Sequence, residues 1–122
     1  MTGSIARVSD GILFKILHRE RFERSEREGR LAWADVDVRD GFVHLSSAAQ
    51  VRETARLHFA GQDGLVLVAI DASRLAPGSL RWEPSRNGAL FPHVYGDVPL
   101  AAIAWSAPLP RGEDGLVFPA GV

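Results

Sequence analysis

The strongest strand pattern in the sequence is the run LVLVAI at residues 65–70. It is continuous, rich in β-branched residues and free of polar interruption. Such a run is typical of a strand that is covered on both faces. Around it, the sequence predicts helices mainly in the first half of the chain and further strands in the second half. This order favours an α+β fold over a doubly wound parallel sheet.

The first part of the chain predicts a strand followed by a helix. Residues 12–17 form an apolar strand pattern with one polar interruption at Lys15. Residues 18–28 carry Glu–Arg pairs four residues apart and stop at Gly29, which indicates a largely exposed helix with a glycine end. Residues 35–41 alternate acidic residues with valine, and we expect a loop or an edge segment there.

A second strand, predicted at residues 42–45, leads directly into a helix start. Ser47 is followed three residues later by Gln50, which matches a capping box. The free N–H groups and partial positive charge of a helix N-terminus favour an anion such as phosphate or carboxylate. We therefore expect an anion site beside His44 and Ser46, which an extended chain points to the same side. The alternative is that the serines only cap the helix and the histidine is a satisfied core residue.

The second half of the chain predicts short strands joined by turns. Residues 80–83 form one strand, and the dipeptide NG at residues 87–88 can supply the positive φ angles of a tight turn. Residues 90–96, LFPHVYG, are apolar but broken by proline and glycine, and we expect an ordered loop. Further strands are expected within residues 99–106 and 115–119.

Two more groups of polar side chains are candidate site residues. Strand alternation puts Arg81 and Glu83 on one side, where a glutamate near a histidine could act as an acid or base or hold a ribose hydroxyl. The alternative is an exposed ion pair of little energetic value. Asn87, His93 and Tyr95 lie in or beside the apolar loop and could line a pocket. Equally, the histidine and tyrosine could be structural.

These observations give a set of candidate residues. Glu83 and His44 are the candidate catalytic residues. The candidate ligand-binding residues are His44, Ser46, Lys15, Arg81, Asn87, His93 and Tyr95. A Ser46–His93–Glu83 triad can be drawn, but no nucleophile-elbow sequence accompanies it.

Composition excludes several classes of function. The chain has 122 residues, a net charge of −1 and no cysteine, which excludes disulfides, thiolate metal sites and cysteine catalysis. The near-zero charge argues against general binding to nucleic acid or anionic lipid. The four histidines have no metal-ligand spacing, so no metal is expected. We expect one cytoplasmic domain over residues 1–122, with no membrane span, no secretory signal and a loose terminus at residues 1–10.

Three segments together resemble the bacterial family catalogued as domain of unknown function 952. They are DGFVHLS at 40–46, HFAG at 58–61, and WEP at 82–84 running on to GALFPHVYG at 88–96. The resemblance covers nearly the whole chain. The family is grouped by fold with the ADP-ribosyltransferases, which implies a split, strongly bent β-sandwich flanked by helices.

The chain also resembles, more faintly, the catalytic lobe of the NAD-dependent tRNA 2′-phosphotransferases. VHLS at residues 43–46 is similar to a His-Leu-Ser stretch of that family. On its first strand that family carries a His-Gly-Thr stretch that holds NAD, whereas this chain reads ILH at 16–18. The resemblance implies a nucleotide cleft near His44 and Ser46. An NAD-like ligand is one candidate there, without a complete NAD motif.

Three hypotheses about function follow. The first is a transferase that acts on an ADP-ribosyl-like or phosphorylated ligand. The second is a non-catalytic small-ligand module that retains the cleft. The third is a partner-binding domain anchored by Trp33 and Trp105, if these side chains are exposed.

Overall fold

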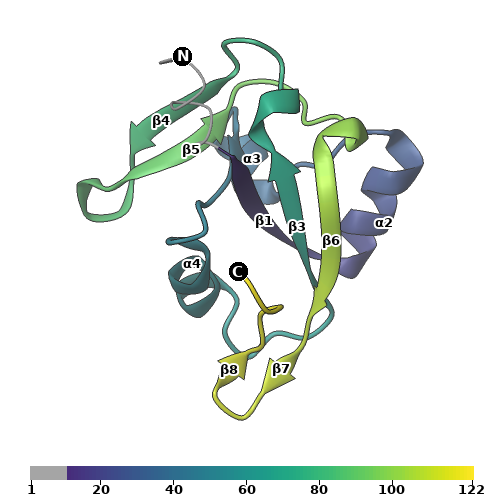
Figure 1. The fold of residues 1–122 in the computed structure, drawn as a ribbon, viewed down its shortest axis with the longest axis vertical. Helices are drawn as coiled ribbons and strands as arrows, with labels where there is room; N and C mark the ends of the chain where they lie inside the picture. The colour runs from purple at the N-terminus through teal and green to yellow at the C-terminus, as the bar shows by residue number, and fades with distance from the viewer. Residues whose placement is uncertain (1–10) are drawn as a thin grey trace.

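The chain folds into two three-stranded antiparallel sheets with three α-helices around them (Figure 1), in a computed structural model that describes residues 11–122. The first sheet has the order β1 (Ile12–His18), β3 (Leu65–Asp71), β6 (Ile103–Leu109). The second has the order β2 (Val43–His44), β5 (Leu90–Val94), β4 (Leu80–Pro84). The helices are α2 (Arg19–Glu28), α3 (Asp35–Asp40) and α4 (Val51–His58), and β7 (Arg111–Gly112) with β8 (Gly115–Leu116) forms a small hairpin. The α+β prediction is confirmed, and the terminus expected at residues 1–10 lies outside the described residues.

The run at residues 65–70 lies in β3, the middle strand of the first sheet. β3 pairs antiparallel with β1 on one side and β6 on the other. All six residues of the run are buried, because alternate side chains enter two different core clusters. The prediction of a strand covered on both faces is confirmed.

The two core clusters explain how the sheets and helices hold together. One cluster is shared by both sheets and includes Val66, Val68, Ile70, Val43 and Val94. The other lies under α4 and includes Leu65, Leu67, Ala69, Val51 and Ala55.

A backbone bridge between Phe14 and Ser46 joins the two sheets. The Phe14 N–H donates to the Ser46 carbonyl at 2.7 Å, and the Ser46 N–H donates to the Phe14 carbonyl at 2.9 Å. The chain after β2 is thereby fixed against β1, which brings Lys15 beside His44.

The prediction of a loop or an edge segment at residues 35–41 is wrong, because α3 forms there. Asp37, at the third helical position, accepts the Ala34 N–H at 2.9 Å and so satisfies a free donor at the helix start. Gly41 then ends the helix with a φ of 85°. The Gly29 stop predicted for α2 is confirmed, with a φ of 80°.

The prediction that a helix starts at Ser47 is also wrong, because α4 begins at Val51. Only half of the capping box forms: the Gln50 side-chain oxygen accepts the Ser47 N–H at 3.1 Å. The Gln50 amide group reaches across to the Leu90 carbonyl, at 2.7 Å. The helix N-terminus therefore lies beyond Ser46, and its dipole does not account for an anion site there.

The loop expected at residues 90–96 is wrong as well, since residues 90–94 form β5, the middle strand of the second sheet. Pro92 lacks an N–H, but its carbonyl accepts the Leu45 N–H at 3.0 Å. In a strand, the N–H and the C=O of one residue point toward the same neighbouring strand. The nitrogen of Pro92, which carries no hydrogen, therefore faces the β2 side of the sheet, where β2 is only two residues long. The β4–β5 turn does use the predicted positive φ angles at Asn87 and Gly88.

No helix within residues 11–122 is long and apolar enough to cross a membrane.

Candidate functional site

The register of the second sheet brings several predicted residues onto one face. His93 of β5 lies opposite His44 of β2 on one side and opposite Arg81 of β4 on the other. Directly paired side chains of an antiparallel sheet point to the same face. Glu83 and Tyr95 share this face by alternation, as the bonds of Glu83 to His93 and to Tyr95 confirm.

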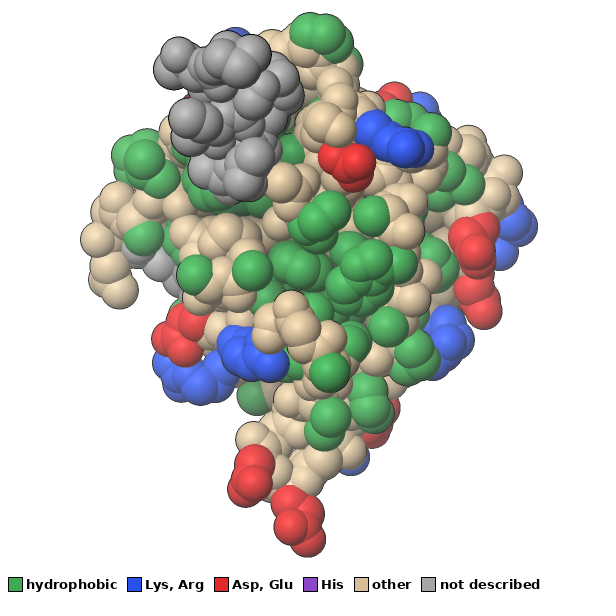
Figure 2. Space-filling view, in the orientation of Figure 1, with side chains coloured by type: hydrophobic (Ala, Val, Ile, Leu, Met, Phe, Trp, Pro, Cys, Tyr) green, Lys and Arg blue, Asp and Glu red, His purple; other side chains and the backbone are tan. Residues whose placement is uncertain are grey.

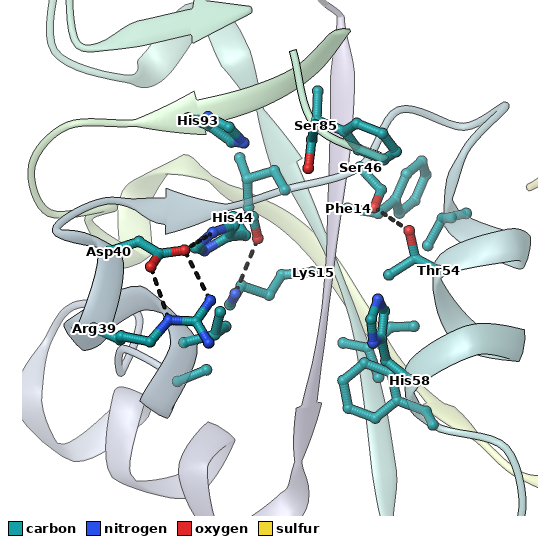
Figure 3. Close-up of a pocket in the computed structure, with 17 residues that line it drawn as sticks. Phe14, Lys15, Arg39, Asp40, His44, Ser46, Thr54, His58, Ser85 and His93 are labelled. Carbon is teal, nitrogen blue, oxygen red and sulfur yellow. Dashed lines mark hydrogen bonds and ion pairs between the residues drawn. The ribbon is translucent and has the colours of Figure 1, made fainter. Parts of the chain in front are cut away.

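A cavity of about 400 Å³ opens beside this face (Figure 3). Its walls come from β1, β2, α3, α4 and β5, from the chain after β2 and from the β4–β5 turn. The aromatic side chains among its lining are Phe14, Phe59 and Phe91. The polar side chains among its lining are Lys15, Arg39, Asp40, His44, Ser46, Thr54, His58, Ser85 and His93.

A glutamate fixes the orientation of His93. Its Nδ1 lies 2.8 Å from Oε1 of Glu83, and the Tyr95 hydroxyl donates to the same oxygen at 2.8 Å. These two hydrogen bonds lower the pKa of Glu83, and the bond to Glu83 raises the pKa of Tyr95. Because an ionised carboxylate can only accept, Nδ1 carries the proton, and Nε2 of the neutral ring is an acceptor. Among the described residues, Nε2 has no hydrogen-bond partner, and the side chain lines the cavity.

A buried ion pair supports the part of the wall beside His93, where His44 lies with its ring centroid 5.3 Å from that of His93. Lys15 Nζ lies 2.9 Å from Oδ2 of Asp37 and donates to the His44 carbonyl at 2.9 Å. Asp37 also accepts the His44 backbone N–H at 3.0 Å and His44 Nδ1 at 2.8 Å. Burial lowers the pKa of Lys15, against the opposing charge of Asp37. Burial alone would raise the pKa of Asp37, but the hydrogen bonds from His44 and the charge of Lys15 together lower it.

His44 is held at both ring nitrogens. Nδ1 bonds Asp37, and Nε2 lies 2.9 Å from Oδ2 of Asp40. Arg39 also binds Asp40, at 2.8 Å and 3.1 Å, and its hydrogen bonds lower the pKa of Asp40 to about 2. While both carboxylates are ionised, both nitrogens of His44 must donate. His44 in this arrangement has no free nitrogen to accept a proton from a ligand.

Phe42 organises the rings of the site. Its ring stacks on His93 with a centroid distance of 4.2 Å and an interplanar angle of 27°. It also contacts His44 at 4.6 Å and Tyr95 at 5.0 Å. The Arg81 guanidinium carbon lies over the Tyr95 ring, 4.9 Å from its centroid.

The predicted residues divide into those at the cavity and those beside it. Lys15, His44, Ser46 and His93 line the cavity. The other predicted residues, Arg81, Glu83, Asn87 and Tyr95, do not.

Two predictions made from the sequence, a pocket role for Asn87 and the triad, do not agree with the structure. Asn87 lies at the tip of the β4–β5 turn with a φ of 54°, where its role is to form the turn. Ser46 Oγ bonds Thr54 at 2.9 Å, so the drawn Ser46–His93–Glu83 triad is not assembled. Only its His93–Glu83 half forms.

The residues of the site that sequence reasoning missed include Asp37, Arg39, Asp40, Phe42 and His58. A lysine inside an apolar strand was a signal for Asp37, because a buried ammonium needs a counter-ion. His58 gave no such signal, since it lies at the end of an amphipathic helix.

The exposure of the tryptophans bears on partner binding. Trp33 and Trp82 pack against the core cluster shared by the sheets. Trp105 of β6 is 38% exposed, and Figure 2 shows apolar side chains gathered over the face of the first sheet. Of the two proposed anchors, only Trp105 is exposed enough to contact a partner.

Within residues 11–122, no group of three or more histidine, aspartate or glutamate side chains is arranged to hold a metal ion.

Comparisons with known proteins identify the family and leave its activity open. The chain resembles protein CC0527 from Caulobacter crescentus, whose X-ray structure has 40% sequence identity and a TM-score of 0.80. That match covers 86% of this chain and 91% of CC0527. The solution NMR structure of CC0527 matches with 39% identity and a TM-score of 0.75, over 86% of this chain and 90% of that one. No curated protein matches the chain significantly. A family model described as "Protein of unknown function (DUF952)" matches residues 16–106, and the chain therefore belongs to this family.

Proposed function

We propose that the cavity binds a nucleotide-type ligand, with a flat ring and an anionic group, and that His93 acts on it as a general base. The observation that carries the proposal is the Glu83–His93 pair. Glu83 holds the Nδ1 proton, which leaves Nε2 of His93 as a proton acceptor at the cavity wall. A histidine oriented by a carboxylate in this way is a recurrent arrangement for proton abstraction.

The lining of the cavity fits a ring-bearing ligand. A volume of about 400 Å³ is within the range of small-molecule sites. Phe14, Phe59 and Phe91 supply apolar surface against which a flat ring can pack.

The charges of the cavity fit an anionic ligand. The one carboxylate on its wall, Asp40, is already bonded to Arg39 and His44 among the described residues. Lys15 and Arg39 are each paired with an aspartate, so an anion in the cavity meets no uncompensated negative charge.

The resemblance to the catalytic lobe of the NAD-dependent tRNA 2′-phosphotransferases supports the same ligand class. It implies a nucleotide cleft near His44, and His44 lines this cavity. In the proposal, Glu83 orients the base, while His44 and Lys15 shape the wall. The reaction class is proton abstraction from water or a ligand hydroxyl, followed by transfer of an ADP-ribosyl-like or phosphorylated group.

A non-catalytic binding module is the second candidate. Both nitrogens of His44, the residue to which the resemblance points, are occupied by aspartates. A module of this kind would bind nucleotides without turnover.

The test is thermal unfolding of wild type, His93→Gln and His18→Gln against a nucleotide panel that includes NAD and ADP-ribose, with mass spectrometry of the mixtures. His18 is the control histidine, because it does not line the cavity and its ring bonds Gln62, while it contacts Phe59 of the cavity lining only through a tilted ring pair with centroids 6.2 Å apart. A saturating ligand raises the unfolding midpoint by several degrees. We expect that shift in wild type and His18→Gln, and product formation that is lost in His93→Gln.

A rise in the unfolding midpoint with no reaction product in any variant supports the non-catalytic binding module. No shift with any nucleotide contradicts the proposed ligand class.

A further inference from the structure

His58 is the histidine whose ring has no hydrogen-bond partner among the side chains that the structure describes. The other three rings are held: His18 by Gln62, His44 by two aspartates, and His93 by Glu83. The side chain of His58 nevertheless lines the cavity, from the last residue of α4. It can therefore rotate, exchange protons with solvent and contact a bound ligand.

His58 and His93 enter the cavity from different walls. His93 projects from β5 and His58 from α4; in Figure 3 His93 lies at the upper left and His58 at the lower right, with the Ser46–Thr54 pair above His58. A proton acceptor and a proton donor on opposite sides suit an in-line displacement, in which the nucleophile enters opposite the leaving group.

We propose that His58 is a second catalytic residue, a general acid opposite His93, and that the substrate is a phosphodiester of a nucleoside-type molecule. This inference rests on the proposed function of His93. Histidine is suited to both roles because its ordinary pKa, near 6.5, makes both protonation states available around neutral pH.

The charges of the cavity select a diester over a monoester. Lys15 is paired with Asp37, and Arg39 is paired with Asp40. Their positive charges are largely compensated, so a monoester dianion would find little free positive charge beyond a protonated His58. A diester carries a single negative charge and needs less compensation.

The reaction balances with water as the nucleophile. His93 Nε2 takes a proton from water, whose oxygen forms a new bond to phosphorus. The bond from phosphorus to the leaving oxygen breaks, and its electron pair stays on that oxygen. His58 gives its proton to the same oxygen. The products are a phosphomonoester and an alcohol, and solvent exchange restores both histidines.

Two diesters that differ in their leaving group test this proposal. They are the methyl ester and the 4-nitrophenyl ester of thymidine 5′-phosphate. Methoxide needs a proton to leave, whereas 4-nitrophenoxide leaves without one. General acid catalysis contributes roughly 100-fold or more. We therefore expect His58→Gln to lower kcat/KM by at least about 100-fold on the methyl ester and by less than about 10-fold on the nitrophenyl ester.

The control variants separate the two proposals. His93→Gln should lower both rates by about 100-fold or more, and His18→Gln neither. The alkaline limb of the methyl-ester pH profile should disappear in His58→Gln. Equal losses on both esters would overturn the acid role of His58. A wild-type protein inactive on both esters would overturn the diester substrate. His93→Gln with unchanged rates would overturn the proposed base instead.

Discussion

Replacing Asp37 with asparagine should strongly destabilise the fold, because this substitution removes the only charge that balances buried Lys15 among the described residues. The Asp37 side chain is 0% exposed, and it accepts donors from Lys15, His44 and Ala34. Breaking a buried pair on one side costs about 3–5 kcal/mol. That is a large part of the about 5–15 kcal/mol that stabilises an ordinary domain. We expect Asp37→Asn to lose about 3–5 kcal/mol of unfolding free energy.

Urea unfolding at neutral pH measures this loss, with Asp35→Asn as the matched control. Asp35 lies on the same helix and pairs with Arg21, but its side chain is 95% exposed. An exposed pair of this kind contributes about 0–1 kcal/mol. A loss in Asp37→Asn no greater than that in Asp35→Asn would refute the account of the buried pair.

The buried pair also predicts how the free energy of unfolding changes with pH. Asp37 has a folded pKa below its ordinary value of 3.8, so the unfolded chain binds the proton more tightly. The stability that its ionisation supplies is complete well above pH 3.8 and is lost as the pH falls below that value. On acidification, wild type should therefore lose more stability than Asp37→Asn. An equal loss in both proteins would contradict the assignment.

Three further predictions concern the core, a helix end and the site. Leu67→Ala should cost about 2–5 kcal/mol in urea unfolding, because Leu67 is fully buried in the core cluster under α4. Gly29→Ala should cost about 1–2 kcal/mol, because alanine must adopt the positive φ that ends α2; a neutral effect would contradict this. Tyr95→Phe removes one donor to Glu83 and should raise the pKa of Glu83 in a carboxyl NMR titration, whereas an unchanged pKa would argue against the hydrogen bond.

The parts of the fold that the sequence predicted depend on local patterns. The run at residues 65–70 carries its own burial signal, and the stop of α2 depends on one glycine. β5 was missed because a proline in a strand argues for a loop. Its place in the sheet depends on pairing with two other strands. β2 is distant in sequence, and β4 is joined to β5 by a turn.

The sequence predicted the part of the candidate site in which alternation along a strand places side chains on one face. Arg81 and Glu83 do share a face with His93 and Tyr95. α3 escaped detection because a short run of alternating acidic and apolar residues also suits an edge strand. Its link to Lys15 spans 22 residues and exists only in the folded chain.

The most direct test of the central claim is the tautomer of His93, read from long-range ¹H–¹⁵N NMR spectra of the ring. The spectra are recorded at a pH where titration shows the ring to be neutral. We predict a protonated Nδ1 and an unprotonated Nε2, because Glu83 accepts the Nδ1 proton. The preference should weaken in Glu83→Gln. A ring protonated at Nε2 in wild type would contradict the account, since His93 would then present no acceptor to the cavity.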